Sequence, residues 1–494
     1  MQFWDNIVNT AMIGTDKKQV SAAELPADLA EPVTVIYNND QADKEQKFLQ
    51  LAAVAFNFRQ TGVTALQKEV SISPAPDEEK AYCSIVAAQT LKDILSEESI
   101  PLLKFWLQHC DRKQQVIIPE TLPALLGIGT QNKNLQVLIA SCCGKRGEWL
   151  SGFNEAWNFS STQTGEELWQ TGTPDQRKII FKETRKINPT LAREWLQQTW
   201  PQEDANTKTG FLELLPENIS EEDIAFLDSL STEKSKKVKE EAIRLLKQIP
   251  GSAIVKQYQE LLQQCVMIKK EKTLLGMVSK TSLQFKLPPS FDETIFKTGI
   301  EKLSSSKEIS DEEFIIYQLI QSAPPSFWQN QLERDPETVI DLFQKDTAGK
   351  KMIPALVSAI TRFRDTSWAQ HFMQHSETFY IDIIPLLQVQ QQEAYSNKFF
   401  DKYPDNIIQY ATQRETEWSV ELSKNIFKHT AKNPYQYNRS FYNQHIHLIP
   451  GSAIAELEKC TPAEENLRNT WSNTSDYIIK LITLKIQTLK AFNS

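Results

Sequence analysis

Glycine is scarce in this sequence, which has 15 glycines among 494 residues, against 24 phenylalanines and 11 tryptophans. Dinucleotide-binding and phosphate-binding folds depend on glycine-rich loops, so the composition disfavours them. No Walker A sequence occurs, and Gly127-Ile128-Gly129 lacks the lysine that such a loop requires, so we interpret it as a helix end. Abundant Leu, Gln, Glu and Lys, which are good helix formers, favour helix over sheet.

Long apolar runs and an excess of positive charge are missing as well. No stretch approaches 18 apolar residues and the N-terminus has no basic region, so we expect neither a membrane span nor a signal peptide. The net charge of −9, from 54 basic and 63 acidic residues, argues against broad attraction to nucleic acid or to an anionic membrane, although a local patch could bind either. Six cysteines without a CxxC pair fit reduced thiols in a cytoplasmic protein.

Signatures of catalysis and of metal binding are also missing. No Gly-x-Ser-x-Gly elbow marks a serine nucleophile. His371 and His375 stand four residues apart on an expected helix, a spacing that can chelate zinc, but Phe372 occupies the place of the glutamate in the HExxH motif. His445 and His447 have no acid or cysteine near them in the sequence. We therefore predict a protein that is not an enzyme and that holds no metal and no cofactor.

The clearest pattern lies between residues 174 and 264, where helix, short turn and helix follow one another three times. A proline marks the middle of each pair, at Pro189, Pro216 and Pro250. In the helix expected over 234–248, one face is apolar and the other is charged; the apolar residues are Val238, Ala242, Leu245, Leu246 and Ile249. One such pair cannot bury its apolar face alone, so we predict an all-α fold, a HEAT-like α-solenoid of stacked helix pairs with a short irregular N-terminal segment.

Composition and linker signals divide the chain into three parts. We predict an N-terminal helical and irregular segment over 1–76, HEAT-like helical repeats over 77–287 and C-terminal helical repeats over 288–494. Within the first part we expect helices over 2–13 and 44–60, an irregular stretch over 18–43 in which Val33–Tyr37 could form a short strand or an extended segment, and a linker over 70–79.

The hexapeptide Ile-Pro-Gly-Ser-Ala-Ile occurs twice, at 249–254 and at 449–454. In both places Pro and Gly are expected to turn the chain and Ser to cap the following helix. Either the two halves are distant duplicates, or the same turn arose twice; the flanking sequences match poorly and leave both interpretations open.

Three segments, in order, resemble a bacterial family known only as a domain of unknown function. The first holds Trp4, Thr10-Ala11 and Gly14-Thr15. The second is Gly144–Leu150 with Asn154 and Trp157. The third runs from Trp169–Thr173 through Ala192–Leu196 to Pro250–Ser252. Together these segments touch about the first half of the chain.

The resemblance implies HEAT-type repeats and a role as an accessory subunit. Genes of that family tend to lie beside genes for a SWIM zinc-finger protein, a MoxR-type AAA+ ATPase and a von Willebrand A-domain protein, which are the partners it implies. It carries no known active site, so no catalytic residue can be transferred. Lys208, Lys234 and Lys239 stand where the family leads us to expect arginine, so a role that needs the planar guanidinium is not expected there.

Two basic clusters are the strongest candidates for a working surface. Residues 177–193 contain six basic residues and one acidic residue, a balance of +5, and residues 234–247 contain six basic and two acidic, a balance of +4. From these clusters we name Lys178, Lys182, Arg185, Lys237 and Arg244 as candidate partner-binding residues. The clusters could be ordinary solvated helix faces, a docking surface for an acidic protein, or a site for nucleic acid.

The segment from Gly144 to Trp157 offers one further candidate. Gly144 and Gly147 permit a tight turn with positive φ, and Arg146 lies between them. The segment could be a structural corner in which Trp149 and Trp157 fill gaps between repeats, or Arg146 could contact a partner.

We therefore expect a cytoplasmic, non-enzymatic scaffold or adaptor that binds proteins and is attached to the ATPase and A-domain system. The alternative is a HEAT-like nucleic-acid-binding protein. The oligomeric state stays open.

Overall fold

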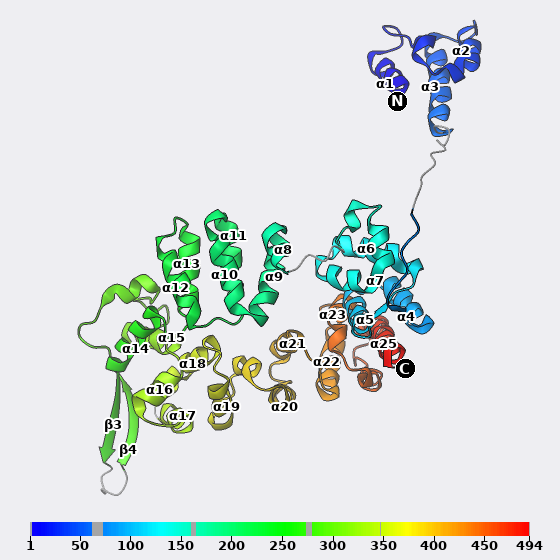
Figure 1. Cartoon of the computed structure of the whole chain (residues 1–494). Coiled ribbons are helices and arrows are strands. Elements are labelled where there is room, and N and C mark those ends of the chain that lie inside the picture. The colour runs from blue at the N-terminus through cyan, green and yellow to red at the C-terminus, as the bar shows by residue number, and fades with distance from the viewer. Residues whose placement is uncertain (1, 62–72, 160–164, 273–278, 346, 494) are drawn as a thin grey trace. The chain divides into compact units, whose positions relative to one another are not determined.

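The computed structural model describes residues 2–61, 73–159, 165–272, 279–345 and 347–493 (Figure 1). The chain forms two compact units, Met1–Pro74 and Ala75–Ser494, and each unit has a hydrophobic core of its own. The expected linker over 70–79 includes the boundary between them, and its first three residues lie outside the described part. The expected division at residues 287 and 288 falls within the second unit and stays a prediction.

The first unit consists of the helices α1 (Gln2–Ile13), α2 (Ala30–Tyr37) and α3 (Lys44–Thr61), with two short 3-10 turns before α2. Their buried side chains form one core: Ile7, Val20, Leu25, Leu29, Val33, Ile36, Leu51 and Ala55. The helices expected over 2–13 and 44–60 are confirmed. The strand expected at Val33–Tyr37 is wrong, because this segment belongs to α2. Val33 and Ile36 both face the core, which a helix permits at a spacing of three and a strand, with its period of two, does not.

The second unit is mostly helical. Its helices are α4 (Ile85–Ser96), α5 (Ile100–Arg112), α6 (Leu122–Gln131), α7 (Gln136–Ser151), α8 (Gly165–Thr171), α9 (Pro174–Ile187), α10 (Pro189–Thr199), α11 (Ala205–Leu212), α12 (Ile224–Ser229), α13 (Lys236–Leu246), α14 (Ala253–Cys265), α15 (Asp311–Ser322), α16 (Ser326–Leu332), α17 (Pro336–Gln344), α18 (Thr347–Arg362), α19 (Thr366–His375), α20 (Val389–Phe399), α21 (Pro404–Thr412), α22 (Val420–Lys432), α23 (Arg439–His445), α24 (Ile454–Leu457) and α25 (Glu465–Asn493). Within the described ranges, no helix combines the length and the apolar character that crossing a membrane requires.

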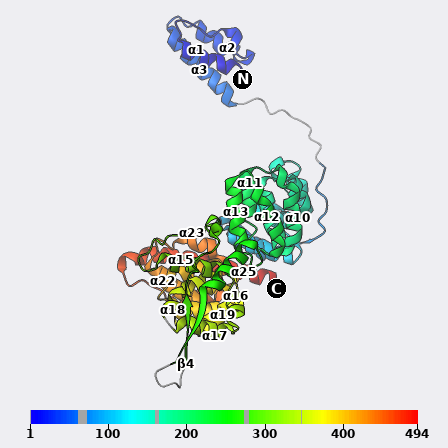
Figure 2. The same ribbon diagram turned by 90° about the vertical axis from the view of Figure 1, so that its left-hand side faces the viewer.

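The predicted predominance of helix is confirmed, although strands interrupt the helices at two places among the described residues. The strands β3 (Val266–Lys272) and β4 (Ser279–Phe285) form an antiparallel hairpin that projects from the helices in both views (Figure 1 and Figure 2). The two-residue strands β1 (Ala81–Tyr82) and β2 (Gln115–Val116) pair in parallel. The hairpin escaped sequence reasoning because its lysines and glutamate suit an exposed helix face as well as an exposed strand.

The helix pairs between residues 174 and 264 form from local signals, as expected. Thr173 and Gln176 make a capping box at the start of α9, and the Asn188 side chain accepts a hydrogen bond from the Leu191 backbone N–H at the start of α10. The five apolar residues predicted to share one face of α13 and its end are all buried. They pack in a core shared with α8 to α12.

The two copies of the hexapeptide adopt different structures. Ser252 caps α14, as predicted: its hydroxyl donates to the Leu246 carbonyl (2.7 Å) and accepts from the Val255 N–H (3.3 Å). Ser452, by contrast, is exposed within a 3-10 turn, Gly451–Ala453, and α24 begins without a side-chain cap. The prediction of a serine cap is therefore confirmed for the first copy and wrong for the second, because the chain enters α24 through the 3-10 turn.

The last helix of the second unit packs against its first helices. α25 lies beside α4 and α5, and side chains from residues 83–143 and 400–492 share one core (Figure 1). Ser99 donates a hydrogen bond to Asn443 (2.6 Å), and Lys480 pairs with Glu97. The buried Lys485 of α25 donates to the carbonyls of His447 and Ile449, both at 2.8 Å. In an open stack each repeat contacts only its neighbours, so these contacts between the two ends are an added feature of this unit.

Candidate anion-binding pocket

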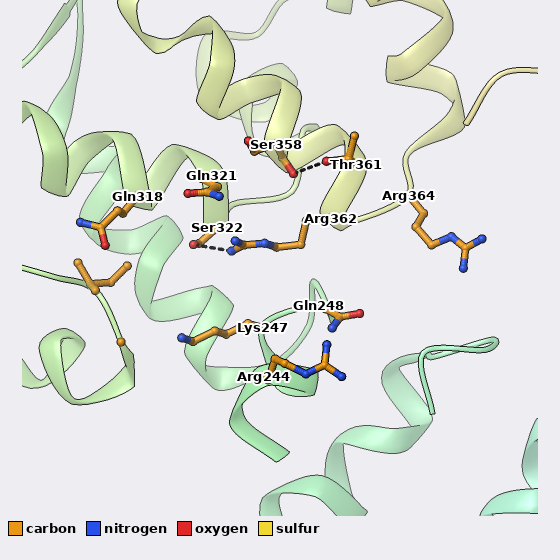
Figure 3. A pocket seen from close by; sticks show the side chains of 12 residues that line it. Arg244, Lys247, Gln248, Gln318, Gln321, Ser322, Ser358, Thr361, Arg362 and Arg364 are labelled. Carbon is orange, nitrogen blue, oxygen red and sulfur yellow. Dashed lines mark hydrogen bonds between the residues drawn. The ribbon is translucent and has the colours of Figure 1, made fainter. Parts of the chain in front are cut away.

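A pocket with a volume of about 680 Å³ lies between α13, α15 and α18 (Figure 3). Twelve residues line it: Arg244, Lys247, Gln248, Gly299, Ile300, Gln318, Gln321, Ser322, Ser358, Thr361, Arg362 and Arg364. Four of these described lining residues are basic, and none is acidic or aromatic. The pocket therefore concentrates positive charge that comes from two helix ends more than a hundred residues apart in the sequence.

Arg362 and Lys247 supply the inner charges of the pocket. The Arg362 side chain runs from the end of α18 toward α15 and donates from Nη1 to the buried Ser322 hydroxyl at 2.8 Å (Figure 3). Lys247 caps the end of α13, and its Nζ lies so close to Gly299 that a Cβ there would be 2.9 Å away. Gly299 has φ +93°, so glycine serves both the left-handed backbone and the close approach of the ammonium group.

Charge in this pocket is only partly compensated by the protein. Arg244 donates to both oxygens of Glu241, at 2.8 and 2.5 Å. Lys247, Arg362 and Arg364 have no ion pair with a carboxylate among the described residues. Burial, and after it the nearby Arg362 guanidinium, lower the pKa of Lys247, and burial lowers the pKa of Arg362. These shifts mean that burial and mutual repulsion disfavour the positive charges of the pocket, a cost that a bound anion would relieve.

Arg364 occupies a backbone position that usually belongs to glycine. Its φ is +52°, and the turn that ends α18 has the Schellman pattern: the Asp365 N–H donates to the Ile360 carbonyl (3.1 Å) and the Arg364 N–H to the Thr361 carbonyl (3.3 Å). A left-handed conformation costs a non-glycine residue about 1–2 kcal/mol. The arginine side chain at this strained position lines the pocket.

The negative ends of three helix dipoles offset part of the positive charge of the pocket. α13, α15 and α18 all end beside the pocket, at Leu246, Ser322 and Arg362, and each helix end carries a partial charge of about −0.5. Three such ends offset about half of the +3 that remains once Glu241 neutralises Arg244. The pocket stays positive, so the geometry suits the binding of an anion. Ser358 and Thr361 already donate their hydroxyl protons to helix carbonyls, which leaves Gln248 and Gln321 as neutral donors.

Arg185, one of the candidate partner-binding residues, is not at the surface. Its side chain is fully buried: it pairs with the equally buried Asp223 and donates to the carbonyls of Glu217 (2.9 Å), Pro189 (3.1 Å) and Asn218 (3.1 Å). Each of its three side-chain nitrogens thus donates a hydrogen bond inside the protein. We correct the prediction: Arg185 joins α9 to the loop before α12 and is unavailable to a partner.

The other basic residues of the first cluster divide between interior and surface. Arg193 pairs with Asp223 and Glu222, both at 2.8 Å. Arg177 pairs with Glu203 at 2.6 Å and lies over the Trp169 ring at 4.3 Å. Lys178 is half-buried, and Lys182 is exposed. The local balance of +5 is therefore largely cancelled by carboxylates that the sequence window did not contain.

The second cluster stays exposed. Lys237 is exposed on α13, and so are its neighbours Lys234 and Lys236; Lys236 makes a loose pair with Glu240 at 3.6 Å. Arg244 is exposed at the other end of α13, where it lines the pocket. The fold thus keeps Lys237 and Arg244 on one helix, whereas Lys182 lies on the wall of a larger cleft of mixed charge between α7 and α9.

The backbone between Gly144 and Arg146 binds a carboxylate group of the same chain. Gly144 has φ +59° and kinks α7, and the backbone N–H groups of Lys145 (3.1 Å) and Arg146 (2.6 Å) donate to the carboxylate of Glu78. The positive φ expected at Gly144 is confirmed, but Gly147 continues the helix. The Arg146 side chain is half-buried, and its role as a partner contact stays a prediction.

His371 and His375 share a neighbour that the sequence did not reveal. Glu337 of α17 lies 3.5 Å from Nδ1 of His371 and 3.3 Å from Nε2 of His375. These three side chains could offer ligand atoms to one metal ion, since the atoms all lie within 4.8 Å of one another. Glu377, the acid nearest in the sequence, pairs instead with Lys350.

Sequence reasoning missed the two arginines of the pocket. Arg362 and Arg364 follow a long apolar helix as Arg-Phe-Arg, and this pair of arginines at a helix end was a detectable signal. Lys247 was counted in the second basic cluster but not singled out. Only the fold places the ends of α13 and α18 beside one pocket.

A family model described as a family of unknown function, DUF5691, matches residues 6–492. The match extends well beyond residue 264, where the resemblance noted in the sequence ended. Neither the curated proteins nor the solved structures contain a match to this chain.

Proposed function

We propose that this chain, which belongs to the family of unknown function DUF5691, is a non-enzymatic scaffold of HEAT-like helical repeats that docks an acidic partner protein on α13. The proposed setting is the cytoplasm. The proposed partners are the MoxR-type AAA+ ATPase, the von Willebrand A-domain protein and the SWIM zinc-finger protein that the family resemblance implies.

One observation carries this proposal: α13 is apolar on one side and basic along the other. Val238, Ala242 and Leu245 are buried in the core of the helix pairs. On the opposite side the exposed lysines are Lys234, Lys236 and Lys237, and the basic series continues at the end of the helix with Arg244 and Lys247. A partner with acidic side chains at helical or extended spacing would meet this positive charge at the start of the helix, at Lys234, Lys236 and Lys237.

Weak internal pairing keeps the charge of Lys236 available to a partner. The pair between Lys236 and Glu240 spans 3.6 Å, and their side chains are 88% and 63% exposed. Surface pairs of this kind contribute about 0–1 kcal/mol, so a partner's carboxylates can replace Glu240 at little cost. In the first cluster, by contrast, Arg185 and Arg193 both pair with one buried acid, Asp223.

The paired helices support the HEAT-like interpretation of the region around α13. α9 packs on α10, and α11 packs on α13. Repeats of this type expose one helix of each pair, and such exposed rows are the usual docking surface of helical repeat proteins. A scaffold with this architecture can act without chemistry of its own, which fits the missing Walker A sequence.

Affinity purification of the full-length chain from its host, followed by mass spectrometry, tests the proposal. Recovery of the ATPase or the A-domain protein, reduced by Lys236→Glu with Lys237→Glu, supports docking on α13. Salt-dependent DNA binding that is lost when Lys178 and Lys182 are reversed would instead favour the nucleic-acid alternative. Arg185 has no place in that test, because it is buried.

A further inference from the structure

We propose that the pocket between α13, α15 and α18 binds a phosphate group or a short phosphate chain, free or carried by a small molecule. This inference goes beyond the proposed docking of a protein partner and does not depend on it. It rests on the placement of the cations, on the absence of acidic side chains from the described pocket lining and on the size of the cavity.

Two cations reach the pocket from different helix ends. Lys247 comes from the end of α13 and Arg362 from the end of α18, while Arg364 also lines the pocket but points away from Arg362 (Figure 3). Arginine presents planar N–H donors that match pairs of phosphate oxygens, and lysine adds a compact charge. Arg362 spends Nη1 on Ser322, which fixes the direction of its side chain while its other donors stay available.

The size of the cavity favours a small molecule over a bare ion. A volume of about 680 Å³ lies within the range of about 300–1,000 Å³ that small-molecule sites occupy. Orthophosphate alone would fill a small part of this space, and a short phosphate chain would fill more of it. Since no described lining residue is aromatic, an attached nucleobase would find no stacking partner and should add little affinity.

Two structural features at this pocket oppose the stability of the protein. Arg364 adopts a left-handed conformation at which glycine would be less strained. Lys247 and Arg362 crowd together although burial and mutual repulsion disfavour their charged forms. Features that oppose stability and converge on one cavity are typical of binding sites.

Isothermal titration calorimetry of the full-length chain, at physiological salt, tests the proposal with pyrophosphate as the probe. We expect binding of one pyrophosphate per chain, tighter than that of orthophosphate or sulfate. Inorganic triphosphate and ATP separate a free phosphate chain from a nucleotide: similar affinities for the two mean that the phosphates are recognised. Saturation only above about 1 mM pyrophosphate, or tighter binding of hexaglutamate than of pyrophosphate, would overturn the proposal.

Three variants connect the binding to the pocket. Arg362→Gln and Lys247→Met should each weaken pyrophosphate binding by about tenfold or more, the usual effect of losing a charge-assisted hydrogen bond. Arg364→Gly should weaken it without harming the fold, because glycine suits the backbone there. Lys237→Met, on the same helix as Arg244 but outside the pocket, is the control. The assignment would be contradicted if Arg362→Gln and Arg364→Gly bound pyrophosphate as tightly as the parent protein does. It would also be contradicted if Lys237→Met lost as much affinity as the pocket variants.

Discussion

Arg185 and Asp223 form an ion pair in which both side chains are fully buried, although the two residues are 38 positions apart and lie in different helix pairs. Asp223 also accepts from Arg193 at 2.8 Å and from the Ser220 N–H at 3.0 Å. The pair ties α9 to the start of α12. A basic residue that the sequence offers as a surface contact is thus a structural element of the core.

Breaking this pair from one side should destabilise the protein strongly. Arg185→Met leaves the Asp223 carboxylate buried with only Arg193 and the Ser220 N–H to balance it, and loss of one member of a buried pair costs about 3–5 kcal/mol. Urea denaturation followed by circular dichroism measures the change. Lys182→Met, on the exposed side of the same helix, should change the free energy of unfolding by less than about 0.5 kcal/mol. Similar stabilities for the two variants would show that Arg185 is not a core element.

Arg364→Gly should stabilise the protein and lower the affinity of the pocket for pyrophosphate. Glycine removes the strain of a left-handed arginine, so we expect a gain of about 1 kcal/mol in the free energy of unfolding, together with weaker pyrophosphate binding. Thermal unfolding and calorimetry of the same preparation measure both. A loss of stability would mean that the Arg364 side chain supports the fold instead.

Gly144→Ala should be costly, because the residue has φ +59° and an added Cβ would lie 2.8 Å from Val116 and in contact with the Glu78 carboxylate. We expect a loss of about 1–3 kcal/mol. Gly127→Ala, where nothing lies within 4 Å of the added Cβ, is the matched helical control and should be neutral or stabilising by up to about 1 kcal/mol. Chemical denaturation of both variants shows whether the left-handed backbone at Gly144 is required for stability.

Glu233 should make stability depend on acidic pH. Its carboxylate accepts from Lys208 (2.8 Å) and from the Trp200 indole (2.7 Å), and the hydrogen bond from Lys208 contributes most to lowering the pKa of Glu233 below its ordinary value of 4.5. A lowered folded-state pKa stabilises the protein above the unfolded pKa, and this contribution is lost as the pH falls through the folded pKa.

Glu233→Gln, which cannot titrate, should therefore be less stable than the parent at pH 7, with a difference that shrinks as the pH falls below about 4.5. Denaturation midpoints across pH 3 to 7 test this. Glu240→Gln, whose carboxylate only meets the exposed Lys236, is the control and should differ little from the parent at pH 7. A difference for Glu233→Gln that stays constant with pH would exclude the Lys208 pair as its cause.

Local patterns were sufficient to predict much of the helical structure. The apolar face of α13 and the caps at Thr173 and Ser252 depend on residues within one or two turns of each other, so the sequence displays them directly. α2 was missed because its short apolar run suits a strand as well as a helix. The hairpin of β3 and β4 was missed because its residues are mostly polar.

Charge compensation could not be predicted, because it depends on packing. The acids that neutralise Arg177, Arg185 and Arg193 are Glu203, Asp223 and Glu222, which follow them by 26, 38 and 29 positions. Counting charges in a window of seventeen residues therefore overstated the first cluster. The pocket is the converse case, since Lys247 and Arg362 line one cavity although they are more than a hundred positions apart in the sequence.

The central claim is that the exposed basic residues of α13 bind the partner protein. It is tested most directly by measuring partner affinity in two charge-matched double variants. Biolayer interferometry would compare Lys236→Glu with Lys237→Glu on α13 against Lys428→Glu with Lys432→Glu on the exposed side of α22, each binding the purified ATPase or A-domain protein. We predict that the α13 variant loses at least about tenfold in affinity while the α22 variant keeps the parental value. Equal affinities for the two variants, or equal losses, would contradict the claim.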